Sequence, residues 1–364
     1  MNEKPSGQFW ISLAQKFVIT LMYLGIIAFF FYFPLLVSCY GPHKTLNVCA
    51  FTETFSPEAI ARFEQKTGVK VNLTYVELDE QIYAKFKINK GEGYDVINVS
   101  DFMVQMLQSQ GLLHAIDHDK VPCVAHINKM LLNQRYDKGN GYSVPHKWFM
   151  YGIIYDKQFF NVTPENVSLD LVFKEPSDLV RQGLAKMPYK ICMLDSPIDS
   201  FFLTALYLFG HADGLSDDAY NHIKNTLVTQ KKWVECYTLY TVEYFLLTDI
   251  VPLAITSSTF ANKIMRYDER FQFVIPRDGG ILVIENLVIP ERSKNKELAY
   301  QFIDFMLSEE IAYLNSSTYG WMSARENAAH IALDEGLRQR LYIPLFDPSA
   351  RARIDDVWLE VECA

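Results

Sequence analysis

The stretch LNVCAFTETFSPEAIARFEQKTGVKVNL, residues 46–73, predicts a strand, a helix and a second strand in succession. Its first six residues, Leu46–Phe51, are mostly apolar, which is typical of a strand buried in a sheet. Ser56 suits the N-cap of the helix, because its hydroxyl can accept a hydrogen bond from a free backbone N–H, and Pro57 suits the first turn. Gly68 can end the helix in the left-handed conformation. The stretch therefore predicts a βαβ unit.

The same order of elements continues along the chain. Tyr94–Val99 predicts another strand, and Phe102–Gln110 predicts the helix that follows it. Strands that alternate with helices form mainly parallel sheets, whose ligands bind beyond the carboxyl ends of the strands. The loops at Thr52–Phe55 and Ser100–Phe102 are therefore expected at one mouth of the sheet. Another buried strand is expected from Tyr142–Pro145 followed by Met150–Tyr155, and later strands are expected near Val251–Thr256, Phe271–Ile275 and Ile281–Pro290.

The N-terminus carries a targeting or anchoring segment. Phe17–Val37 is a run of 21 uncharged, mostly apolar residues, long enough to span a bilayer as a helix. It ends in Leu36-Val37-Ser38-Cys39, which matches the lipobox of bacterial lipoproteins, so Cys39 is expected to be lipidated and residues 1–38 removed. An uncleaved transmembrane anchor is the alternative, because signal-peptide cores are usually shorter. In both cases Lys16 and Lys4 favour a cytoplasmic N-terminus, which places the body outside the inner membrane.

Composition excludes several classes of protein. The chain has 364 residues, of which 49% are apolar and 21% charged, as is ordinary for a globular protein with room for two domains. The formal net charge is −9, which disfavours a nucleic-acid partner. The six cysteines show no CxxC spacing, so a zinc ribbon is not indicated, although one disulfide remains open.

Motifs for catalysis are missing from the sequence. It contains no phosphate-binding GxxxxGK, no HExxH, no GxSxG and no GxGxxG. His114 and His118 lie four residues apart beside Asp117, a spacing that can bind a metal, but they follow a glycine stop in what reads as an exposed turn. We therefore expect neither a metal site, nor a cofactor, nor an enzyme.

Segments spread in order along the chain resemble the polyamine-binding members of the type II periplasmic binding proteins, which serve bacterial ABC importers. The segments are Phe51–Glu53 with the following helix to Val71, Tyr83–Lys85, Tyr94–Ser100, Gly111–Leu113, Ile116–Asp117, Tyr142–Pro145, Gly279–Glu285, Ile289–Pro290 and Lys294–Glu297. The resemblance implies an α/β fold of two hinged lobes, each a mainly parallel sheet flanked by helices. Lobe one would combine residues 45–145 with 286–333, and lobe two 146–285 with 334–364.

The resemblance also implies a ligand site in which carboxylates hold ammonium groups and aromatic rings pack on methylenes. Glu53, Asp199 and Glu285 fall on acidic positions of the family and Ser100 on a serine, while Thr256 and Val283 replace tryptophans. The full set of expected site residues is Phe51, Thr52, Glu53, Ser100, Phe102, Ser196, Asp199, Thr256, Val283, Glu285 and Trp321. Phe51, Phe102 and Trp321 take aromatic positions, and Ser196 stands where an aspartate is usual.

Glu285 is the strongest individual candidate on the residues alone. It interrupts the apolar run Ile281–Ile289, and a charge buried in such a strand needs a cationic partner. The partner is either an arginine of the chain, in an internal salt bridge, or a ligand ammonium, for which Glu285 would be the principal anchor. Glu53 can equally be a solvated loop acid, and Trp321 an ordinary core aromatic residue.

These observations predict an extracytoplasmic solute-binding protein. It would capture a small cationic ligand, with a polyamine such as spermidine or putrescine expected first, and deliver it to an ABC permease and ATPase. A different small solute, such as an amino acid or another cation, stays open as the alternative. An enzyme on the same scaffold is a third class, for which the sequence offers no nucleophile and base at motif spacing.

Overall fold

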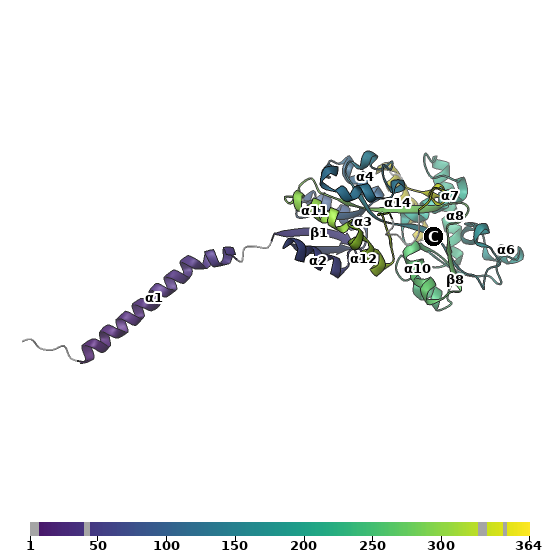
Figure 1. The fold of residues 1–364 in the computed structure, drawn as a ribbon. Helices are drawn as coiled ribbons and strands as arrows, with labels where there is room; N and C mark the ends of the chain where they lie inside the picture. The colour runs from purple at the N-terminus through teal and green to yellow at the C-terminus, as the bar shows by residue number, and fades with distance from the viewer. Residues whose placement is uncertain (1–6, 40–43, 327–332, 345–347) are drawn as a thin grey trace, which may run out of the picture.

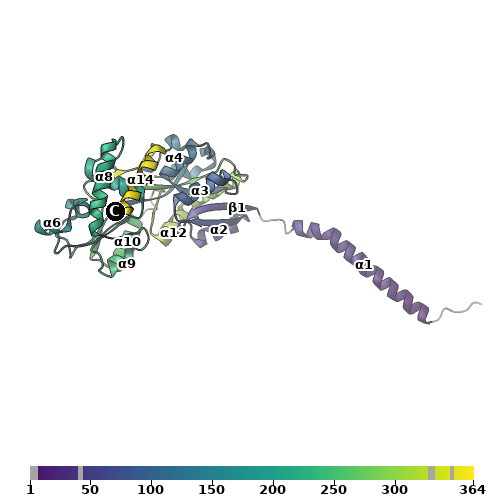
Figure 2. The same cartoon turned by 180° about the vertical axis from the view of Figure 1, so that it is seen from behind.

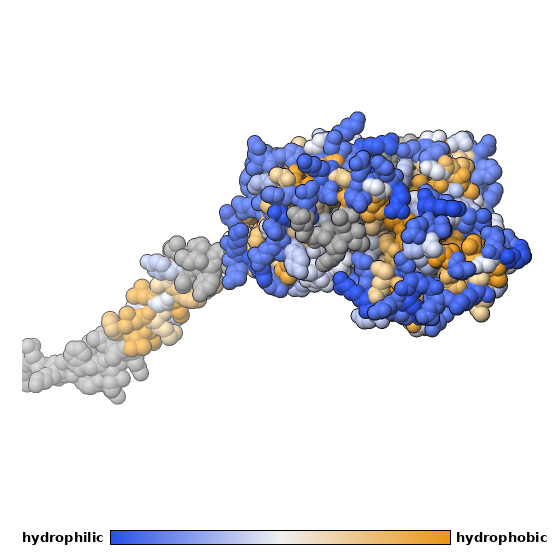
Figure 3. Space-filling view, turned by 45° about the vertical axis from the view of Figure 1, so that its right-hand side comes forward, coloured by the Kyte–Doolittle hydropathy of each residue, from blue (hydrophilic) through white to orange (hydrophobic). Residues whose placement is uncertain are grey.

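The computed structural model describes residues 7–39, 44–326, 333–344 and 348–364. Its first helix, α1 (Gly7–Cys39), stands away from the rest of the chain in both ribbon views (Figure 1, Figure 2). The stretch Lys16–Phe33 is long and apolar enough to cross a membrane, and none of it is buried. In Figure 3 the coloured part of α1 is largely apolar, whereas the visible face of the body is mostly hydrophilic. The side chain of Cys39 lies outside the described residues.

The βαβ unit predicted from residues 46–73 is confirmed. Strand β1 (Thr45–Phe51) pairs in parallel with β2 (Lys70–Val76), and α2 (Pro57–Thr67) connects them. Ser56 Oγ accepts a hydrogen bond from Ala59 N at 3.1 Å, and Gly68 ends the helix with φ 70°. The local sequence signals therefore act as the N-cap and C-cap rules require.

One mixed sheet runs through the body. Its order is β2-β1-β3-β9-β4-β7-β5-β6, with β3 at Val96–Ser100, β9 at Gly280–Val288, β4 at Val144–Asp156, β7 at Leu253–Ser257, β5 at Ile191–Met193 and β6 at Val234–Tyr237. The pairs at both ends of the sheet are parallel, as predicted, whereas β9 runs antiparallel to β3 and to β4. The buried strand expected from residues 142–145 and 150–155 is observed as the long strand β4. Shorter strands join at the side: β8 (Phe271–Val274), β10 (Met322–Ser323) and β11 (Leu341–Tyr342).

Helices flank this sheet (Figure 1, Figure 2). They are α3 (Asp79–Asn89), α4 (Asp101–Ser109), α5 (Asp170–Phe173), α6 (Pro176–Arg181), α7 (Pro197–Phe209), α8 (Asp217–Gln230), α9 (Val242–Leu247), α10 (Ser258–Tyr267), α11 (Lys296–Met306), α12 (Glu309–Tyr319), α13 (Glu335–Gln339) and α14 (Pro348–Cys363). Short 3₁₀ turns fill much of the connection between α4 and β4. The C-terminal helix α14 packs on α7 and α8.

The buried apolar side chains gather into two large clusters. We call the first core the cluster built on β1, β3, α2 and α11, with Phe63 and Phe302 among its members, and the second core the cluster built on β5, β7 and α7, with Phe201 among them. Phe102 and Phe149 pack against both cores. Since β4 and β9 contribute side chains to both, these two strands connect the two halves of the body.

Two thiols lie side by side in the second half. Cys192 in β5 is paired in register with Cys236 in β6, and their Sγ atoms are 3.3 Å apart as free cysteines. Disulfide bonding requires a closer approach of the two sulfurs.

Candidate ligand-binding site

A cavity of about 720 Å³ lies between the two cores. The loops that follow the parallel strands build most of its wall, because the carboxyl ends of parallel strands meet at one edge of a sheet. From the first half these are residues 51–53 after β1, 77–80 after β2 and 100–102 after β3; from the second half, 195–199 after β5, 239–240 after β6 and 257, 259 and 260 after β7. The mouth predicted at Thr52–Phe55 and Ser100–Phe102 is thus the mouth of a real cavity.

Ten of the eleven expected site residues line this cavity: Phe51, Thr52, Glu53, Ser100, Phe102, Ser196, Asp199, Val283, Glu285 and Trp321. Thr256 does not. It lies inside β7, paired with Gly152 and only 2% exposed, while its neighbour Ser257 lines the cavity. Successive side chains of a strand point to opposite faces, so a shift of one position separates a wall residue from a core residue.

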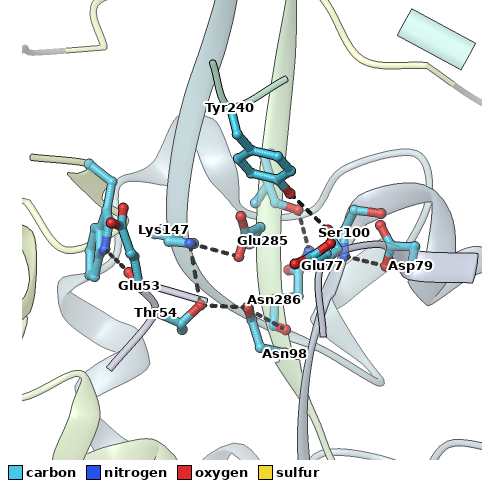
Figure 4. Close-up of polar contacts among 12 residues, drawn as sticks. Glu53, Thr54, Glu77, Asp79, Asn98, Ser100, Lys147, Tyr240, Glu285 and Asn286 are labelled. Atoms are coloured by element: carbon cyan, nitrogen blue, oxygen red, sulfur yellow. Dashed lines mark hydrogen bonds and ion pairs between the residues drawn. The ribbon is translucent and has the colours of Figure 1, made fainter. Parts of the chain in front are cut away.

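Three polar residues form a row across the middle of the sheet. Ser100 in β3 is paired with Glu285 in β9, and Glu285 is paired with Lys147 in β4 (Figure 4). Lys147 Nζ lies 3.1 Å from Glu285 Oε2, and each side chain is 8% exposed. The cationic partner that Glu285 requires is therefore supplied by the chain itself, as the salt-bridge alternative expected, but it is a lysine and not an arginine.

Lys147 is held by more than one contact. Its Nζ is 3.4 Å from Thr54 Oγ1 and 5.7 Å from the centroid of the Trp321 ring. The register of β4 against β9 shifts between Pro145 and Lys147, a β-bulge that places His146 and Lys147 differently from a regular strand. His146 packs between the rings of Phe55 and Trp321, and burial, followed by the charge of Lys147, lowers its pKa to about 3. His146 is thus neutral at physiological pH.

Burial raises the pKa of Glu285 and of three aspartates in the cavity wall. Desolvation is the largest cause in each case, and it raises the pKa of Asp79 to about 8, of Asp101 to about 7 and of Asp199 to about 6. Asp101 accepts backbone hydrogen bonds at both oxygens, from Phe102 N at 2.7 Å and from Ile284 N at 3.0 Å. Asp199 accepts one from the Ser196 hydroxyl at 2.7 Å. None of the three aspartates has a cationic partner among the described residues.

The charge of the wall is strongly negative. Nine carboxylates and two cationic side chains, Lys147 and Arg351, are among the described residues that line the cavity. A concave site lined by one sign of charge attracts ligands of the opposite sign. Aromatic rings complete the wall: Phe51, Phe102, Phe149, Tyr151, Tyr240, Phe260, Trp321 and Trp358. Carboxylates beside aromatic rings can bind an ammonium group and the methylenes attached to it.

Several wall residues were missed in the sequence analysis. They are Glu77, Asp79, Glu80, Asp101, Lys147, Tyr151, Tyr240, Arg351 and Trp358. Asp101 follows β3 directly, so the rule that selected Glu53 could also have selected it, whereas Asp79 stands three residues after the end of β2. Lys147 is a charge inside an apolar strand, like Glu285. Arg351 and Trp358 carry no such signal, because α14 reaches the cavity only through tertiary packing.

Contacts at the rim join the two halves of the body. Lys263 Nζ of α10 lies 3.0 Å from Glu53 Oε2, and the Tyr240 hydroxyl donates to the carbonyl oxygen of Glu77 at 3.0 Å. Arg351 of α14 contacts Glu80 Oε1 of α3 at 2.9 Å. Glu53 is 52% exposed at its side chain, so it belongs to the rim rather than to the buried part of the site.

Known proteins with similar sequences are binding proteins. The chain is 26% identical over 286 residues to the spermidine/putrescine-binding periplasmic protein of Escherichia coli (strain K12), which covers 77% of each chain. It is 25% identical over 348 residues to the putrescine/cadaverine-binding protein of Pseudomonas aeruginosa, covering 88% of this chain and 94% of the relative.

Solved structures agree on the fold. A spermidine/putrescine ABC transporter substrate-binding protein from Streptococcus pneumoniae superposes with a TM-score of 0.73 at 22% identity, covering 88% of this chain and 99% of that one. A lipoprotein of Treponema pallidum gives a TM-score of 0.76 at 21% identity, covering 87% and 99%. The two-lobed α/β binding-protein fold expected from the sequence is confirmed.

The family model for bacterial extracellular solute-binding proteins matches residues 58–335, which is most of the chain. Its members and the relatives above are transport proteins that bind solutes, so the prediction of a binding protein rather than an enzyme is also confirmed. The mixed sheet, the cavity at the carboxyl ends of its parallel strands and the sequence match all lead to one conclusion: this chain belongs to the bacterial extracellular solute-binding proteins.

Proposed function

We propose that this protein captures a small organic amine of the polyamine class outside the inner membrane and delivers it to an ABC permease and its ATPase. The observation that carries the proposal is the cavity wall, where carboxylates outnumber cations nine to two beside many aromatic rings. The names of the relatives, which bind spermidine, putrescine or cadaverine, support the same class of ligand.

Within this proposal the ligand lies among the predicted residues Phe51, Thr52, Ser100, Phe102, Ser196, Asp199, Val283, Glu285 and Trp321, with Glu53 at the rim. Asp79 and Asp199 anchor ammonium groups, since both are carboxyls of the wall without a cationic partner among the described residues. Phe51 and Phe102 pack on the methylenes. Thr256 acts indirectly, by packing behind Ser257.

The proposal includes closure of two lobes. Lobe one comprises residues 45–145 and 286–333, and lobe two 146–285 and 334–364. Within the segment 334–364, the side chains of Val357 and Val361 in α14 pack in the second core, whereas Leu341 packs in the first. This segment therefore contacts both lobes. The rim contacts of Glu53, Glu77 and Glu80 with the opposite half are formed in the structure and would break when the lobes open. A ligand shifts the open and closed populations only by binding one more tightly.

Titration of the full chain in detergent tests this function. We expect putrescine to bind with favourable calorimetric heat, and neutral solutes of similar size, such as 1,4-butanediol, not to bind. Hydrogen exchange should slow in the loop after β1 and at the start of α10 when the amine is present, because closure orders the rim. Binding of the diol as tightly as the diamine, or the absence of any amine binding, would contradict the proposal.

The N-terminal segment anchors the protein in the same proposal. We expect signal peptidase to cleave before Cys39 and the mature chain to carry lipid there, because residues 36–39 close the apolar stretch with a lipobox. Each buried methylene adds about 0.8 kcal/mol of membrane affinity, so a multiply acylated terminus holds the body firmly. Mass spectrometry of the N-terminal peptide measures this, and Cys39→Ser should leave the segment uncleaved. An unmodified wild-type chain that starts near Met1 would instead indicate an intact transmembrane anchor.

A further inference from the structure

The surroundings of Lys147 are those of a bound amine. Its Nζ has a carboxylate oxygen of Glu285 at 3.1 Å and the hydroxyl of Thr54 at 3.4 Å (Figure 4). The centroid of the Trp321 ring lies 5.7 Å from the same Nζ. A carboxylate, a hydroxyl and an aromatic face are the groups that recognise a ligand ammonium. Lys147 also lines the cavity, and its side chain is only 8% exposed. One amine position of the wall is thus filled by the protein's own side chain.

We propose that Lys147 determines specificity: its ammonium permanently occupies the amine position at Glu285, so the cavity selects a diamine over a triamine. This inference rests on the proposed function and narrows it to a ligand class. An incoming ammonium cannot share Glu285 without meeting the charge of Lys147, and like charges at close range in a poorly solvated site repel strongly.

The remaining carboxylates set the number of charges. Asp101 uses both oxygens for backbone amides, and Glu285 is paired with Lys147. At the rim, Glu53 is paired with Lys263 and Glu80 with Arg351. Glu77, Asp195 and Glu362 are exposed to solvent, whereas Asp79 and Asp199 are more enclosed. Asp79 contacts Ser100 and Asp199 contacts Ser196, and neither has a cationic partner among the described residues. Two such groups match the two ammonium ends of a diamine.

Calorimetric titration of the full wild-type chain with putrescine and with spermidine is the first test. We expect putrescine to bind about tenfold more tightly or better, because the third ammonium of spermidine finds Lys147 where it needs a carboxylate. Equal binding, or tighter binding of spermidine, overturns the role of Lys147 and leaves the proposed function standing. The absence of binding by either amine overturns the proposed function as well. These two failures are therefore distinguishable.

The Lys147→Ala variant is the second test. It opens the space and frees Glu285, so the affinity for spermidine relative to putrescine should rise by about tenfold. Lys147→Arg keeps a cation in place and should keep the wild-type preference, and the double variant Lys147→Ala with Glu285→Gln should lose the gain. Lys70→Ala is the matched control, since Lys70 is also a strand lysine 3.1 Å from a glutamate, Glu64, but lies away from the cavity. An unchanged ratio of affinities in folded Lys147→Ala protein would overturn the proposal.

Discussion

Glu285→Gln should lower the free energy of unfolding of the ligand-free protein by about 3 to 5 kcal/mol, the usual result of removing one partner from a buried ion pair. The substitution leaves Lys147 with a charge that is 8% exposed and has no carboxylate at 3.1 Å. Thr54 and the Trp321 ring stay close to Nζ, but neither carries a negative charge. Chemical denaturation of wild type and variant, in the absence of amine, measures the difference.

A double variant provides the control. In Lys147→Met with Glu285→Met both charges are gone and the volumes are nearly kept, and apolar replacements of buried ion pairs are often neutral or stabilising. We therefore expect the double variant to unfold close to the wild type, far from the sum of its single substitutions. Additive losses, or a Glu285→Gln protein as stable as the wild type, would show that the two side chains do not depend on each other.

The same reasoning changes the role of Glu285 in binding. If it were the principal ligand anchor, Glu285→Gln would weaken amine binding without loss of stability in the free protein. The carboxylate of Glu285 is already neutralised by Lys147. Any effect of Glu285→Gln on amine affinity should therefore come through Lys147, whose unpaired ammonium would face the ligand. The sequence identified Glu285 as a residue that needs a cation, and the internal lysine became visible only when β4 and β9 were paired.

Local signals explain which parts of the fold could be predicted from the sequence. The unit β1-α2-β2 was predicted correctly because Ser56, Pro57 and Gly68 mark its helix within a few residues. The antiparallel pairing of β9 with β3 and β4 was not, because it joins Ser100 and Lys147 to Glu285, far apart in the sequence. The pattern of apolar residues indicates that a strand is buried, but it does not show which strand lies next to it in the sheet.

The candidate site divides in the same way. Acids that follow a strand, such as Glu53, could be placed at the mouth from topology alone. Asp79 was missed because α3 begins after Leu78, which offers no capping side chain to mark the helix start. Thr256 was predicted to line the cavity, but its neighbour Ser257 does so instead. A strand residue can be assigned to one face of the sheet only when the register of the strand is known.

Amine affinity should rise steeply with pH between about 6 and 8. Burial raises the pKa of Asp199 to about 6, of Asp101 to about 7 and of Asp79 to about 8 in the ligand-free protein. An alkylammonium stays charged over this range, as a lysine does. It binds the ionised carboxyls better than the protonated ones, so its binding lowers their pKa values and releases protons. Each proton released makes the affinity rise by up to about tenfold per pH unit below the pKa of the free protein.

The stability of the ligand-free protein should change in the opposite direction. The folded-state pKa values of these aspartates lie above their ordinary value of 3.8, so between about pH 4 and pH 8 the folded chain holds more protons than the unfolded chain. The free energy of unfolding therefore falls as pH rises through this window, and a bound amine offsets the loss.

Calorimetry of amine binding in two buffers of different ionisation enthalpy counts the protons released. Asp199→Asn should remove the part of the pH dependence near pH 6 and leave the part near pH 8, which belongs to Asp79. Affinity that is constant from pH 5.5 to 8, with no proton release, would show that the buried carboxyls do not meet the ligand's charge.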